Sequence, residues 1–143
     1  WQGVKEGNIL GVRMLVEVFP RILVGLMLAG ITLQLIPQET FSSLLGREAG
    51  WKGIFLGTIA GILTPGGPFL YYPLLAALMK AGAGAGAISA YLTSWSLMNF
   101  NRTLIWEVPF LGIPFTLARI IPSVLVPIFI GHLTSILYYR LWD

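Results

Sequence analysis

The residues best suited to bind a solute form a break in a hydrophobic stretch, at positions 64–68. Pro65 and Pro68 prevent a continuous helix, because proline lacks the backbone N–H donor and its ring clashes with the preceding turn. Gly66 and Gly67 allow the backbone to turn and to be approached closely, and Thr64 adds a hydroxyl. Inside a membrane, such exposed backbone is tolerated only against protein or a water-filled cavity. Two half-helices that meet at a Gly/Pro break indicate a transport site.

Four side chains near the break and one arginine farther along the chain complete the candidate site. Tyr71 and Tyr72 would lie in the first turn of the next helix, with hydroxyls that need partners if buried. Ser96 and Asn99 lie at the polar end of the hydrophobic segment that follows. A helix that starts near residue 69 carries about half a positive elementary charge at its N-terminus, and Arg119 would add a full charge. These groups favour a small polar or anionic solute.

Several of these polar residues also have a purely structural interpretation. Arg119 is either an anchor at the lipid headgroups or an inward-facing group that holds an anion or pairs with Glu17. The hydroxyls of residues 89–96 either bond to their own helix backbone or line a pathway. Arg13, Glu17 and Arg21 fall four residues apart on one helix face, which fits either interfacial side chains or a pathway entrance.

The composition excludes several other chemistries. The chain has no cysteine and one histidine, so thiolate metal sites, disulfides and thiol catalysis are excluded. No Ser/His/Asp set, metal-ligand cluster or phosphate-binding loop is present, so we expect neither an enzyme nor a bound cofactor or metal. The net charge of +3 comes from dispersed residues, which argues against nucleic acid as a partner.

The elements that must position these groups are hydrophobic helices. Of 143 residues, 56% are hydrophobic and 10% are charged, against roughly a quarter charged in soluble domains. Long apolar segments cover residues 9–36, 53–63, 69–79 and 115–137, with a Gly/Ala-rich and hydroxyl-rich segment at 82–99. We expect an all-α, polytopic integral membrane protein with about four transmembrane segments, one of them discontinuous. The chain begins at Trp1, and we expect further residues upstream.

The break is expected near the membrane midplane. About 12 residues separate Gly53 from it, or roughly 18 Å at the helical rise, slightly over half of a ~30 Å hydrocarbon core. The pattern leaves open whether the chain reverses at the break as a re-entrant hairpin or continues as a kinked span.

Small residues recur at helical spacing on both sides of the break. Glycines at four-residue intervals let two helix backbones approach closely. The predicted packing face before the break consists of Gly53, Gly57 and Gly61, and the stripe after it consists of Gly82, Gly86, Ser89, Thr93 and Ser96. Because a chain this short offers few helices to enclose a pathway, we expect a homodimer or a higher homo-oligomer.

Residues 61–94 also resemble a known family. Its members have a small-residue helix, a Pro/Gly break, a proline-containing helix that ends in Gly, and an Ala-aromatic-Leu run. Here these features are Pro65, Gly66 and Gly67, then Pro73, then Gly82, then Ala90, Tyr91 and Leu92. The pattern resembles the bacterial predicted permeases that include the organoarsenical efflux permeases. Arsenical members carry cysteine at the break, where this chain has Gly-Gly-Pro-Phe, so the resemblance does not imply capture of arsenic by thiols.

The resemblance implies a multi-pass permease of the bacterial inner membrane, embedded in the lipid bilayer. Family members are often about twice this length with two similar halves, so residues 1–143 would form one half-domain. The expected function is transport of a small polar or anionic solute bound at residues 64–68. The alternative is a non-transporting assembly or channel subunit, because glycine-rich faces serve any oligomer.

Overall fold

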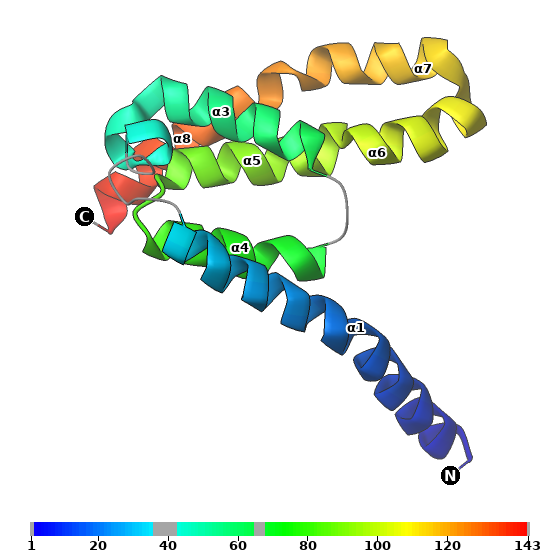
Figure 1. Cartoon of the computed structure of the whole chain (residues 1–143). Helices are drawn as coiled ribbons and strands as arrows, with labels where there is room; N and C mark the ends of the chain where they lie inside the picture. Colours follow the sequence, from blue (N-terminus) through cyan, green and yellow to red (C-terminus); the bar gives the residue numbers. More distant parts are fainter. Residues whose placement is uncertain (1, 36–42, 65–67, 143) are drawn as a thin grey trace.

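A computed structural model describes residues 2–35, 43–64 and 68–142 (Figure 1). Every regular element of these residues is helical. The expected all-α class is therefore confirmed. In chain order the elements are α1 (Gln2–Leu35), η1 (Arg47–Ala49), α3 (Gly50–Leu63), α4 (Pro68–Lys80), α5 (Ala85–Met98), α6 (Phe100–Arg102), η2 (Thr103–Glu107), α7 (Val108–Ser123) and α8 (Leu125–Leu141).

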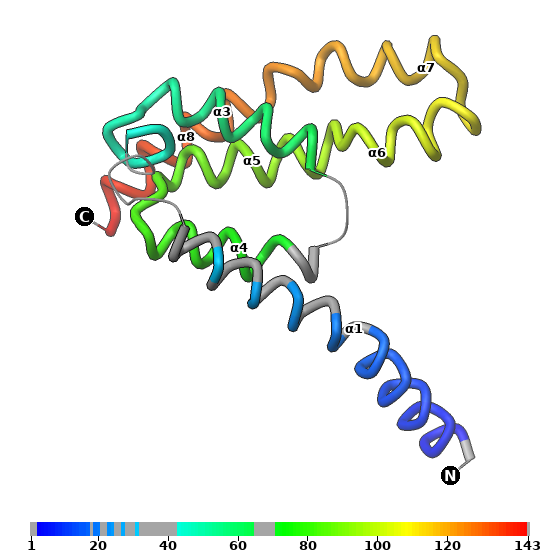
Figure 2. The backbone as a smooth tube through the Cα atoms, in the orientation of Figure 1, coloured from blue at the N-terminus to red at the C-terminus, as the bar shows by residue number. Residues whose placement is uncertain are grey.

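The helices form two groups that diverge at one end. Helix α4 lies along the C-terminal half of α1, while α3, α5 and α8 pack tightly against one another (Figure 1). Helix α6, η2 and α7 form an arm that extends beyond α3, and the N-terminal half of α1 extends away from both groups (Figure 2). The core therefore sits between α3, α5 and α8.

The chain reverses direction between α3 and α4. Helix α3 has 14 residues and α4 has 13, so each is about 20 Å long and shorter than a ~30 Å hydrocarbon core. In Figure 1, α3 runs toward the arm and α4 runs back beneath it. The antiparallel course of α3 and α4 (Figure 1) fits the hairpin better than the kinked span, the two arrangements that the sequence left open.

Backbone contact through glycine holds the core together. A Cβ added at Gly57 would lie 2.3 Å from the Ala87 carbonyl oxygen of α5. A Cβ at Gly86 would lie 2.7 Å from the Gly131 carbonyl oxygen of α8. At Gly57 and Gly86, two helices of this one chain therefore approach closely.

Gly82 has a different role from the one its spacing predicts. It has φ +102 and lies after the end of α4, where its N–H donates to Met79 O at 3.1 Å. The next N–H, of Ala83, donates to Leu78 O at 3.0 Å. This pair of bonds is a Schellman motif, which ends a helix at a left-handed glycine. The predicted stripe thus loses its first member, because α5 begins only at Ala85.

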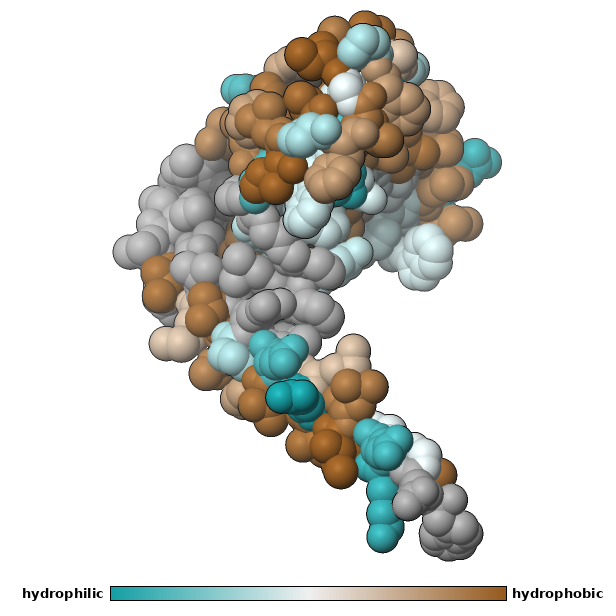
Figure 3. Space-filling view, turned by 90° about the vertical axis from the view of Figure 1, so that its right-hand side faces the viewer, coloured by the Kyte–Doolittle hydropathy of each residue, from teal (hydrophilic) through white to brown (hydrophobic). Residues whose placement is uncertain are grey.

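The C-terminal half of the chain is a long helical hairpin. One helical stretch of the described residues, Ala85–Leu141, contains a window of mean hydropathy 2.0 that is long and apolar enough to cross a membrane. Within it, Gly112 has φ 80 and ψ 160, a non-helical conformation at which the chain turns back, so that the rest of α7 runs opposite to α6 and η2. Hydrophobic residues cover much of the described part of the face in Figure 3. A surface of this kind fits a lipid environment better than water.

Candidate functional site

Two chain breaks meet through the side chain of Asn99. Thr64 is the C-cap residue of α3, directly after Leu63. Asn99 lies between α5 and α6, and its ψ of 118 is not helical. The Asn99 amide Nδ2 donates to Thr64 O at 2.6 Å, and its Oδ1 accepts the Arg102 backbone N–H at 3.0 Å. Asn99 is 6% exposed, so both bonds are shielded from solvent. One side chain thus joins α3 to the start of α6; we call this contact the Thr64–Asn99 junction.

Aromatic residues of α4 and α5 lie beside the junction. Tyr91 interacts with the Thr64 side chain, whose hydroxyl also donates to Ala60 O at 2.6 Å. Tyr71 lies against Trp95, with ring centroids 6.4 Å apart. The Trp95 indole N–H is buried without a hydrogen-bond partner among the described residues. The junction therefore has polar groups embedded in an aromatic wall.

Two arginines close the C-terminal end of α5. The Asn99 break leaves carbonyls of the last turn of α5 without their usual helical partners. Arg102 donates to Ser96 O, and Arg119 Nη1 donates to Leu97 O at 2.6 Å. Cations are favourable at this end because the helix dipole is negative there. Both guanidinium groups therefore stabilise the break.

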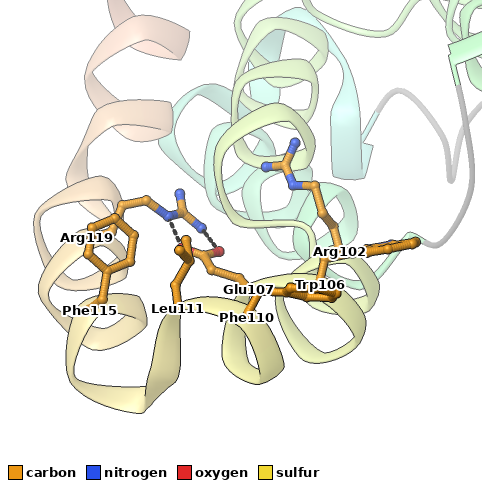
Figure 4. Close-up of a pocket in the computed structure, with 7 residues that line it drawn as sticks. All are labelled: Arg102, Trp106, Glu107, Phe110, Leu111, Phe115 and Arg119. Atoms are coloured by element: carbon orange, nitrogen blue, oxygen red, sulfur yellow. Dashed lines mark hydrogen bonds and ion pairs between the residues drawn. The ribbon is translucent and has the colours of Figure 1, made fainter.

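Arg119 also forms a two-pronged ion pair with Glu107. Its Nε and Nη2 donate to the two carboxylate oxygens of Glu107, as Figure 4 shows. The Arg119 side chain is 30% exposed and that of Glu107 is 10% exposed. Glu17 is not the carboxylate that Arg119 pairs with: its partner is Glu107, 12 positions earlier on the same hairpin.

A large hollow of about 640 Å³ opens beside this ion pair. Stacked rings of Trp106 and Phe110, with centroids 6.0 Å apart, form part of its wall. Its remaining lining residues are Arg102, Glu107, Leu111, Phe115 and Arg119 (Figure 4). The hollow is thus lined by four apolar side chains and by the charged side chains of Arg102, Glu107 and Arg119.

Other predicted residues lie on a different face of α5. Tyr72 of α4 and Ser96 of α5 line one groove of about 450 Å³ between α4, α5 and α8, together with Thr93. The Thr93 hydroxyl donates to Ser89 O, one helical turn earlier in α5, at 2.8 Å. The Ser89 hydroxyl in turn shares a hydrogen bond of 2.9 Å with that of Thr134 in α8. The hydroxyls thus serve both the helix backbone and the packing of α5 on α8.

The predicted site is therefore divided into three places. Thr64 and Asn99 are bonded, Tyr72 and Ser96 share a groove, and Arg119 lies at the end of α5. Pro65, Gly66 and Gly67 lie outside the described residues. Pro68 begins α4, and its side chain also lies outside them.

Sequence reasoning missed Glu107. It is the one acidic residue between Glu48 and Asp143, and it lies 12 positions before Arg119. An isolated carboxylate and an isolated arginine on either side of Pro109 and Gly112 would have indicated an ion pair across a helical hairpin.

No group of three or more His, Cys, Asp or Glu side chains that could hold a metal occurs in the part of the chain that the structure describes. An all-helical hydrophobic chain with backbone breaks and buried charges has the features of a membrane transport protein. The chain matches the model of the family described as predicted permeases over residues 5–140. It therefore belongs to this predicted permease family, and it is a membrane transporter. No curated protein matches the chain, and no solved structure matches it.

Proposed function

We propose that this permease moves a small polar or anionic solute, which binds at the Thr64–Asn99 junction near the membrane midplane. The observation that carries the proposal is the bond from Asn99 Nδ2 to Thr64 O, because it brings two separate chain breaks to one place. Helix α3 reaches Thr64 after 14 residues, or about 21 Å, and α5 reaches Asn99 after the same number. Both breaks are thus at a similar depth. Breaks of this kind supply transporters with backbone groups for binding.

The charge near the junction supports a polar or anionic solute. Arg102 and Arg119 contact the last carbonyls of α5, within three residues of Asn99. Glu107 neutralises one of these two positive charges. The three side chains together carry a net charge of +1, which favours anions over cations in a low-dielectric setting.

A channel or assembly subunit is the second candidate. The observation in its favour is that Gly57 and Gly86 pack helices within the chain, a role that any helical membrane protein can use. Asn99 satisfies backbone groups at both breaks in either case, so the two candidates differ in whether a solute also binds and moves at the junction.

Asn99→Ala should separate them. The measurement is the transient current that follows a rapid rise in anion concentration over vesicles adsorbed on a solid-supported membrane. We expect this current to be at least tenfold smaller for the variant than for the wild type. The probes are inorganic phosphate, sulfate and acetate, with empty vesicles as the blank. Asn99→Ala removes two hydrogen bonds. At about 1–3 kcal/mol for each group left unpaired, the variant should be destabilised but still fold.

Asn101→Ala is the matched control, because Asn101 is exposed and two positions away. It should retain the wild-type current. Currents that are absent for all three anions in the wild type, or equal in wild type and Asn99→Ala, would contradict the proposed function.

We further propose that two copies of this half-domain associate in the inner membrane to enclose the pathway. Support comes from hydrophobic side chains that no other helix covers, such as Leu15 of α1, 64% exposed, and Phe110 of α7, 76% exposed. Native mass spectrometry from a mild detergent should give twice the mass of the chain. A monomer mass from a preparation that still gives anion currents would refute the dimer.

A further inference from the structure

A third, smaller cavity lies near the Thr64–Asn99 junction. Its volume is about 200 Å³, and its lining residues come from α3, α5, α6, η2 and the C-terminal end of α7. The residues that line it are Ile62, Met98, Phe100, Thr103, Ile120 and Val124. Ile62 lies two positions before Thr64, and Met98 and Phe100 flank Asn99. The cavity therefore borders both chain breaks.

Thr103 is the one polar side chain among the described residues that line this cavity. It is 7% exposed, and its Oγ1 is buried without a hydrogen-bond partner among the described residues. The other buried threonines differ: Thr58 donates to Ile54 O at 2.9 Å, and Thr116 donates to Gly112 O at 3.0 Å. A buried hydroxyl without a partner costs about 1–3 kcal/mol, so a ligand that supplies the bond is favoured.

The lining defines the chemistry of that ligand. No lining residue is charged, which disfavours an ion. A buried water needs two to four polar partners, and the side chains that line the cavity offer one. An apolar cavity of about 150 Å³ accepts benzene, so this space is large enough for a ring or a short alkyl chain. A molecule with an apolar body and one hydroxyl would satisfy both the walls and Thr103.

We propose that this cavity is a binding site for a small neutral amphiphile of the phenol or short-chain alcohol class, separate from the polar-solute site at the junction. The hydroxyl of the ligand pairs with Thr103 Oγ1, and its apolar body packs against Ile62, Met98 and Ile120. Thr103 begins η2, a π-helical turn, and such turns are frequent at functional sites. Because the cavity borders both breaks, its occupant would contact the ends of α3 and α5.

The test uses the purified full chain in detergent, with 4-fluorophenol as the probe and 4-fluorotoluene as the probe that lacks the hydroxyl. Each probe is titrated into the protein, and the linewidth of its fluorine NMR signal is measured. We expect saturable binding of 4-fluorophenol to the wild type and binding about tenfold weaker to Thr103→Val, because one hydrogen bond of roughly 1.4 kcal/mol corresponds to a factor of ten. Binding of 4-fluorotoluene should be the same in both.

Two variants keep the result interpretable. Thr103→Ser restores the hydroxyl and should bind 4-fluorophenol within about twofold of the wild type. Thr116→Val removes a buried hydroxyl that already has a partner and should leave binding unchanged. Non-saturable partitioning of 4-fluorophenol, equal binding by wild type and Thr103→Val, or equal loss in Thr116→Val would each overturn the site. None of these outcomes depends on transport at Asn99.

Discussion

Gly61→Leu is expected to prevent the chain from reaching a stable fold. A Cβ at this position would lie 2.2 Å from Ser94 Oγ and 2.3 Å from the Tyr91 carbonyl oxygen. The second contact is with backbone, so the clash is relieved only if α3 moves away from α5. Overpacking costs about 1–3 kcal/mol where side chains can adjust, and more here because backbone must move. Total stability is only about 5–15 kcal/mol, so we expect little monodisperse protein and no cooperative thermal transition.

The matched control is Gly11→Leu. A Cβ at Gly11 meets nothing within 4 Å, and the residue lies on the exposed half of α1. Replacement of a helical glycine by leucine gains roughly 0.5–1 kcal/mol of helix propensity, so the variant should be at least as stable as the wild type. Normal yield and an unchanged Tm for Gly61→Leu would show that α3 and α5 do not pack through this glycine.

Glu107→Gln is expected to destabilise the hairpin through Arg119. The substitution keeps the shape of the side chain but removes the charge that two guanidinium nitrogens contact. Breaking a buried ion pair from one side costs about 3–5 kcal/mol, and the 30% exposure of Arg119 lowers this to a few kcal/mol. At about 2–4 °C per kcal/mol, we expect Tm to fall by roughly 5–10 °C. Differential scanning fluorimetry of the purified protein measures the change.

A double-mutant cycle identifies the cause. Arg119→Met removes the unpaired charge and retains an unbranched side chain, so adding it to Glu107→Gln should recover part of the lost Tm. Arg102→Gln is the comparison, because Arg102 is exposed and is also bonded to the end of α5. It should lower Tm by less than Glu107→Gln does. Strictly additive losses for Glu107→Gln and Arg119→Met would show that the two residues do not act as a pair.

The sequence by itself determined the class of structure and the position of one break. Long apolar segments of low charge predict membrane helices, because a helix satisfies its backbone groups within its own segment. A break after residue 63 could be predicted from Pro65, Gly66 and Gly67 in the sequence, since proline and glycine disfavour a helix locally. Gly57 and Gly61 were recognised as packing positions because four-residue spacing places them on one helix face.

Only the tertiary structure decided how these local features combine. Periodicity identifies a helix face but not the helix that packs against it. From the sequence, Gly57 and Gly86 were equally compatible with contacts between copies of the chain, whereas the structure places them between α3, α5 and α8. Helical spacing likewise placed Gly82 on a packing stripe, although its positive φ ends α4.

The candidate site shows the same division. Thr64 and Asn99 were each chosen for local polarity at a break, yet the bond between them joins residues 35 positions apart. Arg119 was recognised as an isolated charge, but its partner depends on the reversal at Gly112, which brings Glu107 beside it. Local composition fixes where a helix must end or carry a charge. The partner of each end and each charge depends on contacts distant in the chain, which the three-dimensional packing of the helices alone determines.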